Sequence, residues 1–200
     1  MARQIELDRD ELKEKMIQTA FQLVEKGGPK ALSARKISTN LDVSIGTLYN
    51  VVNSLDIIKF HVKARILDQF FNKLRENAGT NNWDKNTLHN IADIYLAFVT
   101  ENKNLWRLVL EETSTPYPLW YLKEISDLFT YLESILASIT GISLKTAKQS
   151  IFVLWAGLQG LSSLYQLNKI NIVSETSFEE HVKFLLDSHI LGITTFENQK

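Results

Sequence analysis

Apolar residues recur at the three- to four-residue spacing of helices along almost the whole chain, and no stretch alternates as a half-buried strand would. Glycines, prolines and short polar clusters interrupt this spacing and mark where helices end. The interruptions predict helices over residues 10–26, 34–41, 45–52, 55–77, 84–101, 103–112, 118–139, 143–169 and 175–196. We therefore expect an all-α protein.

The second and third predicted helices are short, and a serine precedes each of them. Ser33 and Ser44 occupy N-cap positions, where a hydroxyl accepts a hydrogen bond from a backbone N–H of the first turn. The second helix ends near Asn40 or Leu41, and Leu41-Asp42-Val43 form the turn between the two helices. Two short helices joined by a tight turn and packed on a longer helix are typical of a helix-turn-helix, whose second helix fits the major groove. The spacing alone is equally compatible with a solvent-exposed αα-hairpin.

A longer motif favours the helix-turn-helix. Residues 31–58, ALSARKISTNLDVSIGTLYNVVNSLDII, resemble the N-terminal DNA-binding domain of the TetR family of transcriptional regulators. The matching residues are Leu32-Ser33, Ile37, Val43-Ser44, Gly46-Thr47-Leu48-Tyr49 and Asp56, with Ile17, Ala20, Phe21 and Gly27-Gly28 upstream. The resemblance implies a three-helix helix-turn-helix domain, joined by a long helix to a C-terminal helical domain that binds an inducer and dimerises.

The same resemblance identifies candidate DNA contacts. They are Ser33, Arg35, Lys36, Ser44, Ile45, Thr47, Tyr49 and Asn50. Ser33 matches a hydroxyl that contacts a phosphate, and Arg35 matches a position that can reach a base edge. Tyr49, with a planar ring and a phenolic donor, is the strongest candidate for a phosphate contact. Ile45 is apolar, so it either contacts a thymine methyl group or makes no base contact.

Leu55 departs from the family pattern, because many members carry a lysine there that anchors the fourth helix to a phosphate. Val51-Val52 also replace the usual aromatic pair. Losing one phosphate contact lowers the salt dependence of DNA binding by about 0.9 in log-log slope. We expect Lys30, Lys36 or the N-terminal arm to compensate for the missing charge.

The best candidate for a domain boundary is the small and polar stretch 78–82. Residues 1–56 are expected to form the DNA-binding domain, 55–77 the connecting helix, and 78–200 the ligand-binding and dimerisation domain. Charge follows this division: residues 1–75 carry 13 lysines and arginines against 9 acidic residues, whereas the remainder has a net charge of −5. A basic N-terminal module is compatible with a polyanionic partner such as double-stranded DNA.

The C-terminal half is rich in aromatic residues with polar tips, which more often form a core than a ligand site. A helical domain that admits a small molecule nevertheless lines its cavity with such residues and a few polar groups. By helix face, the candidates for a small-molecule pocket are Tyr95, Phe98, Trp106, Trp120, Phe129, Trp155 and Gln159.

The last two predicted helices carry apolar stripes that are expected to pair with a second copy in a four-helix homodimer interface. The stripes consist of Ile151, Leu154, Trp155, Leu158, Leu161, Ser162 and Tyr165, and of Phe178, Val182, Leu185, His189, Ile193 and Phe196. Ala156, Gly157 and Gly160 would permit close approach of the helices.

Nothing in the sequence points to an enzyme, a metal site or a bound cofactor. The four histidines lie far apart, and there is no cysteine, nucleophile elbow or phosphate-binding glycine loop. The chain also lacks a signal-peptide core and an apolar run long enough to span a bilayer, so we expect a cytoplasmic protein.

The expected function is that of a homodimeric TetR-like regulator, in most cases a repressor, which a small-molecule effector releases from its operator. An alternative is an all-α ligand-binding or protein-interaction module that has lost specific DNA binding. Leu55, Ile45 and the small basic excess are the features that favour this alternative.

Overall fold

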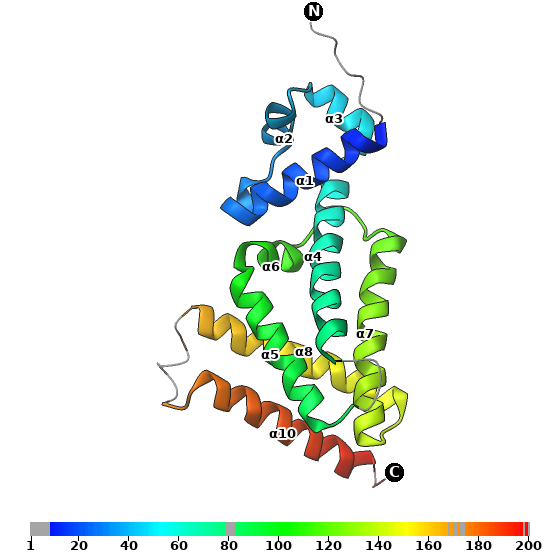
Figure 1. Cartoon of the computed structure of the whole chain (residues 1–200), viewed down its shortest axis with the longest axis vertical. Helices are drawn as coiled ribbons and strands as arrows, with labels where there is room; N and C mark the ends of the chain where they lie inside the picture. The colour runs from blue at the N-terminus through cyan, green and yellow to red at the C-terminus, as the bar shows by residue number, and fades with distance from the viewer. Residues whose placement is uncertain are drawn as a thin grey trace, which may run out of the picture. The chain divides into compact units, whose positions relative to one another are not determined.

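The computed structural model describes residues 9–78, 83–167, 169, 172, 175–197 and 199, and these residues form helices and no strand (Figure 1). The helices are α1 (Arg9–Gly27), the short 3₁₀ helix η1 (Pro29–Ala31), α2 (Ala34–Leu41), α3 (Ile45–Val52), α4 (Leu55–Ala78), α5 (Lys85–Glu101), α6 (Lys103–Leu110), α7 (Leu119–Thr140), α8 (Leu144–Gln166) and α10 (Phe178–Glu197). The prediction of an all-α fold is confirmed, while η1 was not predicted. The expected boundary at 79–82 lies outside the described residues.

The helices form two compact units, each assembled from separate parts of the chain. Unit 1 comprises Met1–Asp68 and Asn102–Leu122, and unit 2 comprises Gln69–Glu101 and Lys123–Lys200. Two helices, α4 and α7, therefore contribute residues to both units. The grouping also places α6 with the helix-turn-helix region, although the sequence suggested that α6 belongs to the C-terminal domain.

The core of unit 1 begins with one apolar face of α1. Met16, Ala20 and Val24 recur at four-residue intervals on this face and are fully buried. The face packs against η1, α2, α3 and α6, and Ile37 of α2 and Leu48 of α3 are likewise fully buried. Figure 1 shows α2 and α3 beside α1. The two short helices are thus supported by a common longer helix.

The end of α1 requires a glycine and receives support from α6. Gly28 has φ 72° and ψ −179°, a conformation essentially restricted to glycine, and its N–H donates to the Val24 carbonyl at 2.7 Å. Asn104 of α6 donates from Nδ2 to the carbonyl oxygen of Glu25 at 2.9 Å. Because the last carbonyls of a helix lack partners within the helix, this side chain stabilises the end of α1.

A buried lysine connects α4 to the segment after α6 within unit 1. The Lys63 side chain is fully buried, and its Nζ donates to the carbonyl oxygen of Glu111 at 2.5 Å. Burial lowers the pKa of Lys63. The ammonium group lies at the C-terminal end of α6, where the partial charge of the helix favours a cation.

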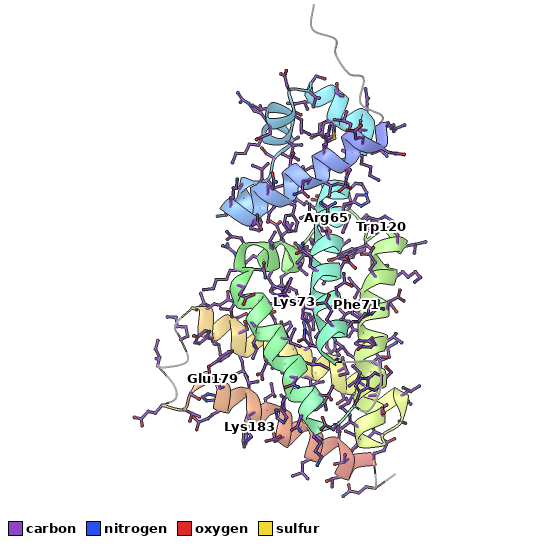
Figure 2. The ribbon with its side chains drawn as sticks, viewed as in Figure 1. Arg65, Phe71, Lys73, Trp120, Glu179 and Lys183 are labelled. Carbon is purple, nitrogen blue, oxygen red and sulfur yellow. The ribbon has the colours of Figure 1, made fainter. Side chains whose placement is uncertain are left out.

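Aromatic rings reinforce this connection. Phe60 of α4 contacts Tyr117 and Tyr121, with ring centroids 5.5 and 5.3 Å apart. His61 stacks on Trp120 at 4.6 Å, and Figure 2 shows Trp120 at the start of α7. The first half of α4 is consequently held by rings as well as by the buried ammonium group.

In unit 2, α8 and α10 pack against each other and against α5. Two polar contacts fix this pairing. The carboxylate of Glu197 on α10 accepts hydrogen bonds from the Ser143 N–H at 3.0 Å and the Thr146 hydroxyl at 2.6 Å, at the start of α8. Along the same pair, Ser150 Oγ lies 2.5 Å from Nε2 of His189, so half-buried His189 takes part in the packing of α8 and α10.

Replacing Gly28 with alanine should destabilise the folded chain by about 1–3 kcal/mol, because the added Cβ disfavours the backbone conformation that ends α1. Thermal unfolding measures the effect. The matched control is Gly46→Ala, since Gly46 lies in α3 without a positive φ, and only Ser44 Oγ, at 3.5 Å, lies near an added Cβ. Equal unfolding midpoints for the two variants would contradict the assignment.

Lowering the pH should lower the stability of the folded chain through protonation of His189 in unit 2. Burial lowers the pKa of His189 below 6.5, so the unfolded chain binds a proton more readily than the folded chain. The contribution of neutral His189 to stability is complete above the unfolded pKa and is lost as the pH falls through 6.5 towards the lower folded-state value. Between about pH 7.5 and about pH 5.5, the urea midpoint of wild type should fall more than that of His189→Gln. Equal decreases in the two proteins would show that His189 does not contribute.

Candidate nucleic-acid interface

Two serine hydroxyls set the first residues of α2 and α3. Ser33 Oγ accepts a hydrogen bond from the Lys36 N–H at 3.3 Å, and Ser44 Oγ accepts one from the Thr47 N–H at 2.9 Å. The Ser44 and Thr47 hydroxyls also lie 2.8 Å apart. Capping occupies the acceptor side of each serine. The Ser33 hydroxyl hydrogen stays available to a nearby anion, and the Ser44–Thr47 pair keeps one hydroxyl hydrogen, because one of the two hydroxyls donates to the other.

The turn between α2 and α3 is closed by its own backbone. Asp42 adopts the left-handed conformation with φ 53° and ψ 44°, which short polar residues tolerate better than most. The Val43 N–H returns to the Ser38 carbonyl at 3.0 Å. This arrangement satisfies the backbone of the turn locally.

The caps and the turn orient the predicted DNA contacts outward. Leu48 and Val52 face the core of unit 1, with 0% and 2% exposure, which directs the opposite face of α3 to solvent. The exposed predicted residues are Arg35, Lys36, Ser44, Ile45, Tyr49 and Asn50, whereas Ser33 and Thr47 are half-buried by their capping contacts. The eight side chains therefore lie along α2 and α3 as donors, apart from the apolar Ile45.

An arginine that the motif did not identify lies at the other end of α3. Nη2 of Arg9, the first residue of α1, donates to the carbonyl oxygen of Asn50 at 2.9 Å. Asn53 then turns the chain with φ 63°, and the Ser54 hydroxyl accepts from the Ile57 N–H at 3.2 Å to start α4. The only sequence signal for Arg9 is a cation just before the predicted start of the first helix.

The seven predicted pocket residues fall in different units. Trp106 is 4% exposed in the core of unit 1, and Trp120 stacks on His61 in the same unit. Neither belongs to the C-terminal group in which the sequence placed them. The reason is that α6 and the start of α7 pack with the N-terminal helices, which helix faces read from sequence do not reveal.

The other five residues lie in unit 2 on α5, α7 and α8. The Tyr95 hydroxyl donates to Oε1 of Gln159 at 2.6 Å, and Nε2 of Gln159 donates to the Ser163 hydroxyl at 3.0 Å. Trp155, one turn earlier on α8, packs edge-on against Phe129 at 5.9 Å. The fifth residue, Phe98, is buried on α5 one turn after Tyr95. The arrangement combines aromatic surface with a short polar chain inside the unit.

The predicted interface stripes of α8 and α10 are buried only in part. Ile151, Leu154, Leu158 and Ser162 of α8 are buried, as is Val182 of α10. An added Cβ on Gly157 would lie 2.9 Å from Cδ2 of Leu185, so Gly157 permits close approach of α8 and α10 in the same chain. The buried part of the stripes packs within unit 2, whereas Tyr165 and Phe196 of the same stripes are 46% and 56% exposed. A homodimer interface on the last two helices stays a prediction.

Another face of each helix is apolar and exposed. Phe152 and Val153 on α8 are 59% and 52% exposed, and Phe184 and Leu191 on α10 are 74% and 70% exposed. Near them on the sequence, Gly160 has no atom within 4 Å of the position of an added Cβ. The sequence analysis did not select these residues, because the neighbouring stripe follows the three-four spacing of a helix face more regularly.

Comparison of the sequence with protein-family models and with curated proteins gives no match. Solved structures, in contrast, match over nearly the full length. A protein of unknown function from Rhodococcus sp. RHA1 has a TM-score of 0.73 at 15% identity, over 96% of this chain and 98% of that one. A possible TetR family transcriptional regulator from Streptomyces coelicolor A3(2) has a TM-score of 0.67 at 14% identity, over 92% and 99%.

A third similar structure is a TetR variant from Acinetobacter baumannii AYE in complex with minocycline, with a TM-score of 0.65 at 18% identity, over 96% of this chain and 99% of that one. The chain adopts the TetR fold. The TetR resemblance of residues 31–58 is thus matched by three-dimensional similarity that extends over both units.

The described part of the chain offers no group of three or more histidine and acidic side chains that could hold a metal ion. None of its helices combines the length and the apolar character that a membrane span requires. The exposed polar residues of α2 and α3 include DNA contacts that the sequence predicts.

Proposed function

We propose that this chain is a DNA-binding transcriptional regulator that recognises an operator through α2 and α3. The observation that carries this proposal is the exposed set of donors on two serine-capped helices, with Arg35, Tyr49 and Asn50 outward and Leu48 inward. Helix α3 is eight residues long, a length suited to the major groove. In this role the protein acts in the cytoplasm as a repressor and has no catalytic activity.

A small-molecule effector is proposed to bind unit 2 near Tyr95, Phe98, Phe129, Trp155 and Gln159. Large aromatic surfaces with a few placed polar groups are typical of ligand sites, and the Tyr95–Gln159 hydrogen bond supplies such a polar group. The minocycline complex of the similar TetR variant supports this role by analogy. Binding there changes the orientation of α4, which contributes residues to both units, and thereby releases the operator.

Homodimerisation is proposed to occur through the exposed apolar face of α8 and α10 that includes Phe152, Val153, Phe184 and Leu191. Large apolar side chains at 52–74% exposure are unfavourable in water, and clusters of them mark interaction surfaces. Exposed Gly160 would allow the helices of two copies to approach closely. A dimer would present two copies of α3 to half-sites about one turn of DNA apart, or a multiple of that spacing.

The alternative is an all-α ligand-binding or protein-interaction module without specific DNA binding. Leu55 favours it because no cation stands at the start of α4, and Ile45 does so because an apolar side chain is 45% exposed on α3. The two functions differ in one measurable property, which is sequence-dependent retention of DNA.

Selection from genomic fragments should retain specific DNA, and Arg35→Ala and Tyr49→Phe should each weaken its binding. Loss of the Tyr49 hydroxyl removes an expected phosphate contact, at about 0.5–1.5 kcal/mol per half-site. Loss of Arg35 removes an expected base contact, at about 1–3 kcal/mol per half-site. Titration of the retained fragment at moderate salt measures both effects.

The control is Tyr117→Phe, because Tyr117 is 47% exposed in unit 1, close to the 43% of Tyr49, but lies outside α2 and α3. It should leave the affinity unchanged. Full affinity in both Arg35→Ala and Tyr49→Phe would contradict the assigned surface, and absence of any retained fragment at low salt would support the alternative function.

Phe184→Glu should convert the dimer to a folded monomer, because a carboxylate on the apolar face would be buried without a partner in the dimer. Sedimentation velocity measures the mass, and circular dichroism verifies that the variant is folded. Leu119→Glu is the matched control, since Leu119 is 85% exposed but lies in unit 1 at the start of α7. A wild type that is monomeric, or a Phe184→Glu dimer, would contradict the proposed interface.

A further inference from the structure

The absence of a cation at Leu55 raises the question of which group contacts the backbone of DNA at the end of α3 and the start of α4. Phosphate contacts set the orientation of a DNA-binding domain and supply much of its affinity. A replacement for the missing lysine must lie near this junction and must not be neutralised within the protein. The inference below rests on the proposed DNA-binding function and assigns one further contact to it.

The cations of α4 that follow Leu55 in unit 1 are all engaged. Lys59 pairs with Asp56 at 3.5 Å, with a side chain that is 21% exposed. Lys63 is fully buried on the Glu111 carbonyl. Arg65 binds Glu14 and Gln18 of α1, and Figure 2 shows Arg65 on the part of α4 near α1. None of these three side chains is therefore available to a phosphate without loss of an internal contact.

Arg9 satisfies both requirements. Its guanidinium group reaches the last turn of α3 through the 2.9 Å hydrogen bond to the Asn50 carbonyl, five positions before Leu55 in the sequence. The residue is exposed, and no carboxylate in the described ranges pairs with it. The charge of Arg9 thus stands at the end of α3 from which the chain turns into α4.

We propose that Arg9 contacts a DNA phosphate at the C-terminal end of α3 and replaces the anchor that Leu55 does not provide. A guanidinium group carries five N–H donors in a fixed plane, and the Asn50 carbonyl occupies one of them. The remaining donors can bind phosphate oxygens, a geometry that arginine favours. Because the Asn50 carbonyl already holds the side chain, less conformational entropy is lost on binding.

The test is the salt dependence of operator affinity for wild type, Arg9→Gln and Arg9→Lys. Arg9→Gln should lower the log-log slope by about 0.9 per subunit, or about 1.8 for a dimer on two half-sites. Between about 50 and 200 mM salt, the affinity of wild type should then fall about ten-fold more than that of the variant. Arg9→Lys keeps the charge and should retain most of the slope.

A second substitution that restores the salt slope of operator affinity distinguishes a phosphate contact of Arg9 from a purely structural role. Adding Leu55→Lys to Arg9→Gln should restore the slope, because it returns a cation to the start of α4. Arg107→Gln is the matched control, since Arg107 is an exposed arginine of unit 1 on α6. The salt slope of the Arg107→Gln variant should equal that of wild type. Thermal unfolding of each variant reports on stability separately.

The outcomes distinguish this inference from the proposed function. If wild type retains no DNA in a salt-dependent manner, both are wrong. If wild type binds but Arg9→Gln keeps the full slope, the Arg9 assignment is wrong and the proposed function stands. A weaker Arg9→Gln with unchanged slope and a lower unfolding midpoint would show that Arg9 only stabilises α3, which also overturns the inference.

Discussion

The buried ammonium group of Lys63 is the constraint on which the organisation of unit 1 depends. A buried charge without a partner costs several kcal/mol, so the group must reach an oxygen. It reaches the Glu111 carbonyl, and this contact requires α4 to lie at the C-terminal end of α6. The Asn104 contact with Glu25 in turn holds α6 to α1. Residues 102–122 consequently belong in unit 1 with α1, α2 and α3, although α5 separates them in the sequence.

This arrangement explains which parts of the fold were predictable from sequence. Helix ends depend on local chemistry: Ser33, Ser44 and Gly28 define them through caps and a glycine conformation that are visible in a few consecutive residues. The place of α6 depends on Lys63 meeting a carbonyl 48 positions away and on Asn104 meeting one 79 positions away. No periodicity encodes such pairs, because each involves one polar side chain and a backbone atom.

The candidate sites likewise differ in how far they could be predicted from the sequence. The outward residues of α3 follow from its start at Ile45, which fixes the rotation of a short helix whose Leu48 and Val52 must be buried. The proposed ligand site and dimer face were harder to predict, because α8 and α10 have apolar residues on more than one side. Periodicity identified the Ile151 stripe as the interaction surface. A helix with apolar residues on two sides packs the stronger stripe internally and leaves residues such as Phe152 exposed.

Helix α3 is short, and its two ends are held by side chains from outside its own hydrogen-bond ladder. Its first turn is fixed by the Ser44 hydroxyl, and its last turn by the guanidinium group of Arg9 on the Asn50 carbonyl. A helix of eight residues makes few hydrogen bonds of its own and is marginal in isolation, so both ends need external partners. The same two partners place a hydroxyl and a cation at opposite ends of the proposed DNA-binding surface, where the phosphates that flank a major groove would lie. Stability of the helix and its proposed grip on DNA therefore depend on the same side chains.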